Sequence, residues 1–199
     1  MEAMDFFRLS EGRWRSQRTT HHLPFRRAEL GELEIQASAI EAGDPRLAEI
    51  CQLHQIDPNL AIGGGSVQWQ GSMAWDQDKD GHQGATIFAL VPDDGNPNQG
   101  KLLRDVGYAE KMPVVGYFQV DDQGGLNLIT DYEATSSIER FWFPNPNLRI
   151  RTSTVQRFGG FSTASFCAET RLTDDAAESA HVESQPASPA AQFHSIWGW

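Results

Sequence analysis

The stretch TSSIERFWFPNPNLRIRTSTVQR, residues 135–157, decides the fold class. Two alternating segments flank a turn built from Pro144-Asn145-Pro146-Asn147, and this arrangement predicts an antiparallel β-hairpin. Similar alternating segments, separated by turn residues, recur at intervals of about ten residues along most of the chain. The pattern therefore predicts an all-β protein, an antiparallel barrel or sandwich, and ten such segments would make a ten-stranded barrel with one or two short helices.

Two short helical segments interrupt the strands. Asp5–Ser10 is a short amphipathic turn, and Asp44–His54 is a helix in which Asp44 caps the amino end and Pro45 is the first helical residue. The glycines at 63–65 are expected to free the backbone just before the third strand. Ten strands suffice to enclose one small ligand. The expected strands are residues 12–22, 29–40, 66–76, 84–92, 101–109, 113–120, 124–133, 135–143, 148–157 and 161–172.

Composition excludes several classes of protein. The 199 residues carry 16 basic and 27 acidic side chains, a net charge of −11, which argues against general binding of nucleic acid or anionic membranes. No apolar run approaches the roughly 20 residues that span a bilayer, and Met1–Arg8 lacks the features of a signal peptide. We therefore expect the protein in the cytoplasm, without membrane insertion.

One domain is expected at 1–172, followed by a tail. Residues 173–199 are rich in Ala, Pro and acidic residues and contain no Lys or Arg, which predicts disorder. Cys51 and Cys167 have no metal-type spacing and are expected to be reduced, buried and without a chemical role.

The strand at 66–76 presents an aromatic face. Its odd-numbered residues point to one side, which their apolar character places inside: Val67, Trp69, Gly71, Met73 and Trp75. This face is either ordinary core or a flat wall for a large conjugated ligand, and the strand alone leaves both interpretations open.

The hairpin places Arg149, Arg151 and Ser153 on one face. Glu139 lies on the same side only if the turn has even parity, and a slip of one residue would put it opposite. A surface ladder of charges is the alternative interpretation. Arg18 shares the face of Trp14 in the first strand, and three inward arginines suit a ligand with two carboxylates.

Metal and nucleophile motifs are weak. Asp76–Gly81 resembles the start of a calcium loop, but the closing glutamate is absent and Ile87 stands in its place. The histidines have no zinc spacing, and no Gly-x-Ser-x-Gly elbow is present. The sequence therefore predicts no metal site.

Gly12-Arg13-Trp14 resembles the first-strand signature of lipocalin-like barrels, in which the Trp closes one end and a late Arg, here Arg157 or Arg171, packs over it. Over residues 4–172 the chain resembles the S-type phycobiliprotein lyases of cyanobacteria, often labelled CpcS or CpeS. The strings that carry this resemblance are Gly12–Trp14, Ser16–His22, Trp69, Trp75, Gly107–Glu110, Ser136–Leu148 and Arg157–Phe161.

The resemblance implies a lipocalin-like or fatty-acid-binding-protein-like barrel that binds a linear tetrapyrrole (bilin), either phycocyanobilin or phycoerythrobilin. A lyase of this kind attaches the bilin through a thioether to a cysteine of a phycobiliprotein α or β subunit during phycobilisome assembly. The resemblance implies no obligatory cofactor. It also implies a homodimer or a heterodimer with a related lyase subunit.

The resemblance also implies site residues. Glu139 and Arg149 are the implied catalytic residues. Those implied to bind the bilin are Arg18, Val67, Trp69, Trp75, Glu139, Arg149, Arg151 and Ser153. A carrier that binds bilin without catalysis is the alternative, and a lipid-binding barrel a more distant one.

Overall fold

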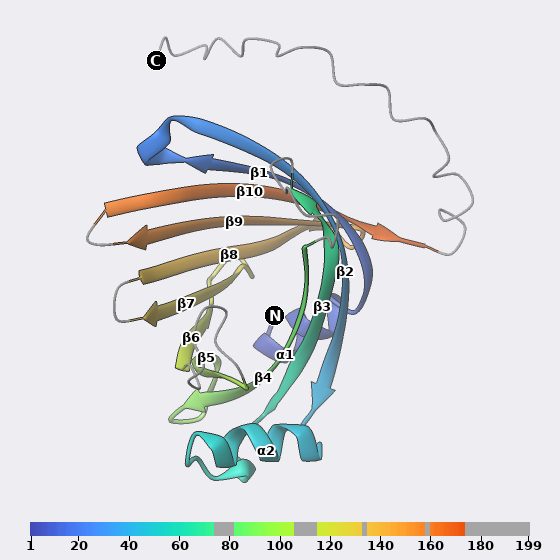
Figure 1. Cartoon of the computed structure of the whole chain (residues 1–199). Coiled ribbons are helices and arrows are strands. Elements are labelled where there is room, and N and C mark those ends of the chain that lie inside the picture. The colour runs from blue at the N-terminus through green and yellow to red at the C-terminus, as the bar shows by residue number, and fades with distance from the viewer. Residues whose placement is uncertain (74–81, 106–114, 133–134, 158–159, 174–199) are drawn as a thin grey trace.

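The computed structural model describes residues 1–73, 82–105, 115–132, 135–157 and 160–173. Its strands form one closed barrel in the order β1-β10-β9-β8-β7-β6-β5-β4-β3-β2, and every neighbouring pair is antiparallel (Figure 1). The predicted ten-stranded barrel is therefore confirmed. The strands are β1 (Gly12–His22), β2 (Arg27–Glu41), β3 (Gly63–Met73), β4 (His82–Asp93), β5 (Asn96–Arg104), β6 (Val115–Val120), β7 (Leu126–Tyr132), β8 (Thr135–Asn145), β9 (Leu148–Arg157) and β10 (Gly160–Leu172).

The strands β3 and β5 begin furthest from their expected first residues. The glycines at 63–65 lie within β3 and not before it, because the strand passes too close to Phe88 for side chains: a Cβ on Gly65 would lie 2.7 Å from the Phe88 ring. Strand β5 begins at Asn96 and not at 101. Asp94 and Gly95 adopt φ angles of 39° and 78°, which form a tight hairpin turn directly after β4.

The two helices lie at the same end of the barrel, below and within the ring of strands in Figure 1. Helix α1 (Ala3–Leu9) packs Met4 and Phe6 against inward side chains of β4, β5, β6 and β7. Helix α2 (Pro45–Leu53), capped by Asp44 as predicted, packs on the outside against β2, β4 and β5. Two 3-10 turns, Leu23–Phe25 and Pro58–Leu60, complete the elements. We call the end of the barrel that holds both helices the α1 end. The opposite end, where β1, β3, β5, β7 and β9 finish, is the distal end.

Trp14 seals the α1 end. Its side chain is 0% exposed, and its indole N–H donates a hydrogen bond to the Ser10 carbonyl at 2.9 Å. The Arg171 guanidinium lies 4.2 Å from the centre of the ring and donates to the Leu9 carbonyl at 2.7 Å. Arg157 ends β9 at the distal end. Of the two predicted arginine partners, Arg171 is therefore the correct one.

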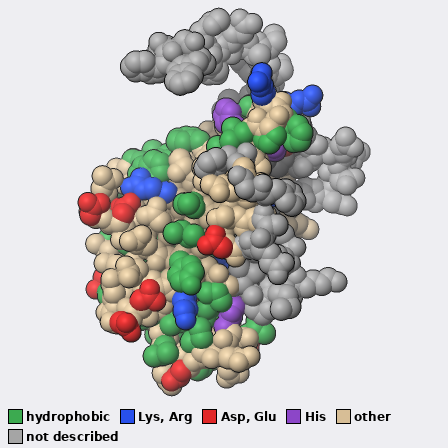
Figure 2. Space-filling model, turned by 90° about the vertical axis from the view of Figure 1, so that its left-hand side faces the viewer, with side chains coloured by type: hydrophobic (Ala, Val, Ile, Leu, Met, Phe, Trp, Pro, Cys, Tyr) green, Lys and Arg blue, Asp and Glu red, His purple; other side chains and the backbone are tan. Residues whose placement is uncertain are grey.

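The outer surface of the barrel carries mixed side chains. On the face in Figure 2, hydrophobic side chains run down the middle and acidic side chains lie mostly to the left. Phe166 and Ile138 are large outward side chains that remain about half exposed. No helix in the described part of the chain has the length and hydropathy needed to cross a membrane. The predicted disordered tail, residues 173–199, lies outside the described residues except for Thr173.

A candidate ligand site on the inner wall

The register of the β8–β9 hairpin places Glu139 on the arginine side. Glu139 is opposite Ser153 and Phe141 is opposite Arg151, with the irregularity in pairing confined to the turn beyond Trp142. All four residues therefore share the inner face of the barrel. The interpretation of this hairpin as a surface charge ladder is wrong.

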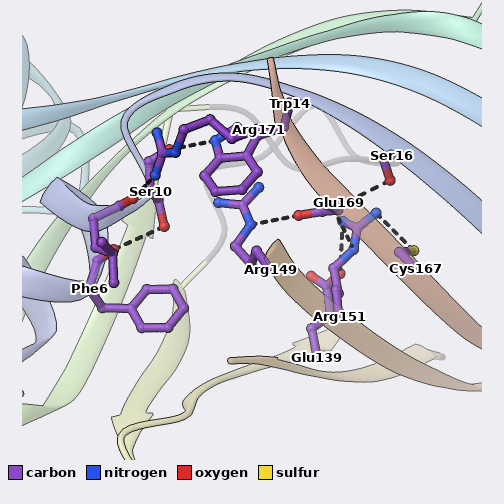
Figure 3. Close-up of polar contacts among 11 residues, drawn as sticks. Phe6, Ser10, Trp14, Ser16, Glu139, Arg149, Arg151, Cys167, Glu169 and Arg171 are labelled. Atoms are coloured by element: carbon purple, nitrogen blue, oxygen red, sulfur yellow. Dashed lines mark hydrogen bonds and ion pairs between the residues drawn. The ribbon is translucent and has the colours of Figure 1, made fainter. Parts of the chain in front are cut away.

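Strands β10 and β1 continue the same wall. Cys167 of β10 is opposite both Arg151 and Arg18, and Glu169 is opposite both Arg149 and Ser16. The structure thus brings together five of the predicted site residues, and Figure 3 shows the part of this cluster around Glu169. The five are Arg18, Glu139, Arg149, Arg151 and Ser153.

Glu169 is a site residue that the sequence analysis missed. Its side chain is 0% exposed, and its Oε2 accepts a hydrogen bond from Arg149 Nε at 2.6 Å. Its Oε1 lies 3.7 Å from Arg151 Nε and accepts a hydrogen bond from Ser16 Oγ at 3.4 Å. One buried carboxylate therefore holds two guanidinium groups in place.

Arg151 lies between two carboxylates. Its Nη1 is 3.6 Å from Glu139 and its Nε is 3.7 Å from Glu169, while Nη2 donates to the Cys167 thiol at 3.5 Å. Burial lowers the pKa of Arg151, but the attraction of Glu169 and Glu139 outweighs it and the pKa is raised. Arg151 therefore remains a cation inside the barrel.

Arg149 retains donors for a ligand. The residue is 6% exposed, and its guanidinium lies 5.0 Å from the Trp14 ring centre and 5.8 Å from that of Phe141. Within the described ranges its side chain makes one hydrogen bond, from Nε to Glu169. Because a guanidinium has five N–H donors, the others are available to an acceptor.

Both cysteines are free and buried, as predicted. Cys51 packs between α2 and the barrel, where burial and then Asp57 raise the pKa of its thiol. Cys167 belongs to the inner wall and contacts Arg151.

The predicted inward face of β3 is confirmed for Val67 and Trp69. Val67 packs against both interior clusters of apolar side chains, and Trp69 packs against the cluster of Trp14, Leu33 and Ile35. Gly84 stands opposite Trp69 on β4, and a Cβ there would overlap the indole ring, so the ring lies over the Gly84 backbone. Trp75 lies outside the described residues.

The interior contains buried polar atoms that make no hydrogen bond. Five buried side-chain atoms in the described residues have no hydrogen-bond partner, and four lie on the inner face: Arg18 Nε, Thr86 Oγ1, Arg104 Nε and Arg151 Nε. Leaving such a group unpaired costs about 1–3 kcal/mol. An interior of this kind suits a ligand that accepts hydrogen bonds.

Metal ligands do not gather in this part of the protein. Among the described residues no group of three His, Cys, Asp or Glu side chains is arranged to hold a metal ion. The calcium-like string at 76–81 lies outside those residues. The site is therefore a wall of arginines, carboxylates and aromatic rings.

Known proteins share this chain's sequence and fold. A family model described as CpeS-like protein matches residues 2–172. Chromophore lyase CpcS/CpeS 2 of Trichodesmium erythraeum is 55% identical, with 100% of both chains covered. Phycocyanobilin lyase subunit CpcS of a Picosynechococcus species is 51% identical, covering 100% of this chain and 98% of the relative. The solved S-type phycobiliprotein lyase CPES of Guillardia theta matches with a TM-score of 0.76 and 31% identity, over 87% of this chain and 94% of that one.

Proposed function

This chain belongs to the CpcS/CpeS family of chromophore lyases, which attach a bilin to a phycobiliprotein, and we propose from that membership that its inner wall binds the bilin. The substrate is phycocyanobilin or phycoerythrobilin, and the acceptor is a cysteine of a phycobiliprotein subunit. The proposed compartment is the cytoplasm.

The chemistry of a bilin suits the inner wall. A bilin is long and conjugated and carries two propionates, and the barrel offers Trp69 and Val67 as a flat apolar surface and guanidinium groups as anion partners. Arg149 and Arg151 donate to carboxylate oxygens, and Ser153 adds a hydroxyl on the same face. We assign Trp75 to the same binding role from the family resemblance alone.

Glu139 is the proposed partner of the pyrrole nitrogens. Its carboxylate faces the interior, is about one-quarter exposed and has Arg151 at 3.6 Å as its cationic neighbour. A carboxylate in this position accepts hydrogen bonds from pyrrole N–H groups and favours the protonated, electron-poor chromophore. That form is the better electrophile for a thiolate.

The reaction proceeds through positioning. Helix α1 and Trp14 fill one end of the barrel, so the bilin enters from the distal end and keeps its ring A ethylidene there. The acceptor thiolate adds to the ethylidene carbon, the C–S bond forms, and the displaced electron pair of the double bond takes up a proton at ring A. No covalent enzyme intermediate is needed, and the protein contributes orientation and control of protonation.

The observation that carries this proposal is the inward cluster of Arg149, Arg151, Glu139 and Glu169. The test is to add phycocyanobilin to the protein and record a shifted and sharpened visible absorption band, and then to add an acceptor subunit. The proposal expects attachment to the correct cysteine faster than spontaneous addition. Binding without acceleration would identify a carrier, and no spectral change would overturn bilin binding.

Gly84→Ala is expected to weaken bilin binding about tenfold or more. The new methyl group overlaps the Trp69 indole, so the ring must swing away from the wall and into the space of the ligand. Titration followed by visible absorption measures the loss. Gln83→Ala, an exposed change on the same strand, is the control and should bind as the wild type does. Equal affinity in both variants would show that Trp69 does not line the site.

We further propose that the outer face of β2, β1 and β10 contacts a second copy of the protein or a related lyase subunit. Leu30 of β2 and Phe166 of β10 are both exposed, and each lies opposite Thr19 on the strand β1 between them. Exposed apolar side chains on adjacent strands are common at subunit contacts.

A further inference from the structure

Arg104 is an inward arginine that has no role in the bilin site proposed above. It is the last residue of β5, at the distal end, and stands opposite Phe88 of β4. Phe88 and Leu102, two residues earlier on β5, both belong to the interior apolar cluster, so Arg104 shares that inner face. Its Nε is buried without a hydrogen-bond partner.

Most of the other inward charged groups lie beside a group of opposite charge. Glu169 holds Arg149 and Arg151, Glu139 lies beside Arg151, and the inward Glu29 of β2 lies 3.1 Å from His22 Nε2. Two inward arginines combine a buried Nε that has no hydrogen-bond partner with the lack of a carboxylate partner among the described residues. They are Arg104, which makes no side-chain hydrogen bond there, and Arg18, whose contact is with Ser165 at 3.4 Å.

These two arginines lie on different walls. Strand β5 is five strands away from β10 in either direction around the ring, whereas Arg18 on β1 is directly beside β10. A ligand that reaches the Arg18 side with one anionic group therefore presents its other side to β5. Thr86 on the neighbouring strand β4 adds a buried hydroxyl without a partner to that wall.

We propose that Arg104 binds one of the two carboxylates of the bilin, while the wall of Arg18, Arg149 and Arg151 binds the other. The inference rests on the proposed function and adds a second anion subsite to it. A cation on an inner wall is costly until an anion meets it, so this subsite makes the barrel selective for a dicarboxylate over a ligand with one carboxylate. Thr86 donates its hydroxyl to the same carboxylate.

The test compares Arg104→Ala with the wild type for two ligands, phycocyanobilin and its dimethyl ester. The diacid should bind about ten- to a hundredfold more weakly to the variant, the range expected for one charge-assisted hydrogen-bond site. The ester, which has no carboxylate, should bind equally to both proteins. Arg104→Lys should recover part of the affinity for the diacid.

Lys101→Ala is the matched control, because Lys101 is an exposed, outward residue of the same strand. It should bind the diacid as the wild type does. An unchanged diacid affinity in Arg104→Ala would overturn the subsite, and so would an equal loss for diacid and ester, which would indicate a structural effect. If the wild type binds neither ligand, the proposed function itself fails.

Discussion

Glu169→Ala is expected to destabilise the protein by about 3–5 kcal/mol, because it leaves two buried guanidinium groups without their shared carboxylate. Thermal unfolding followed by circular dichroism measures the loss. Bilin binding should fall with it at temperatures where the variant is folded, since Arg149 loses the hydrogen bond that orients it. Glu169→Gln keeps the shape and one acceptor, so its loss of stability should be smaller.

The control for this change is Glu34→Ala. Glu34 pairs with Arg13 on the outer face, where both side chains are more than one-third exposed, and such surface pairs contribute at most about 1 kcal/mol. If Glu169→Ala unfolds at the same temperature as Glu34→Ala, Glu169 does not organise the inner wall.

Arg149→Ala is expected to weaken phycocyanobilin binding by about a hundredfold. The change removes a buried cation whose side chain makes one hydrogen bond, to Glu169, within the described residues, and a charged hydrogen-bond donor of this kind contributes on the order of 1.5–3 kcal/mol. Visible absorption titration gives the affinity. Arg149→Lys keeps the charge but not the planar fork of the guanidinium, so its bilin affinity should lie between those of the wild type and Arg149→Ala.

Arg140→Ala serves as the matched change on the outside of the barrel. Arg140 pairs with Asp121 at 2.8 Å on the outer face of β8. Its loss should leave bilin affinity unchanged. Equal effects of Arg140→Ala and Arg149→Ala would contradict the placement of the ligand on the inner wall.

The faces of the strands could be predicted from the sequence. The period of two along a strand is enough to group Arg149, Arg151 and Ser153, or Val67 and Trp69, without knowledge of any partner strand. The N-cap of α2 could be predicted for the same reason, because Asp44 and Pro45 alone determine it. These features could be predicted because each depends only on residues that are neighbours in the sequence.

The contacts between strands could not be predicted in the same way. Whether Glu139 faces Arg151 depends on the residues accommodated in the irregular turn after Trp142, and a single slip reverses the answer. Glu169 shares its strand face with Cys167. Its role as a partner of Arg149 can be recognised only from the pairing of β10 with β9, which places the two residues opposite each other. The buried carboxylate at the centre of the site is therefore a product of long-range register.

A single-turnover transfer with Glu139→Gln tests whether Glu139 prepares the bilin for the acceptor thiolate. The variant is loaded with phycocyanobilin and mixed with an acceptor subunit, and formation of the thioether adduct is followed by absorption. We predict bilin affinity within about threefold of the wild type and attachment slowed about a hundredfold, the scale of losing an acid–base group. Attachment at the wild-type rate would show that Glu139 does not prepare the bilin for the thiolate.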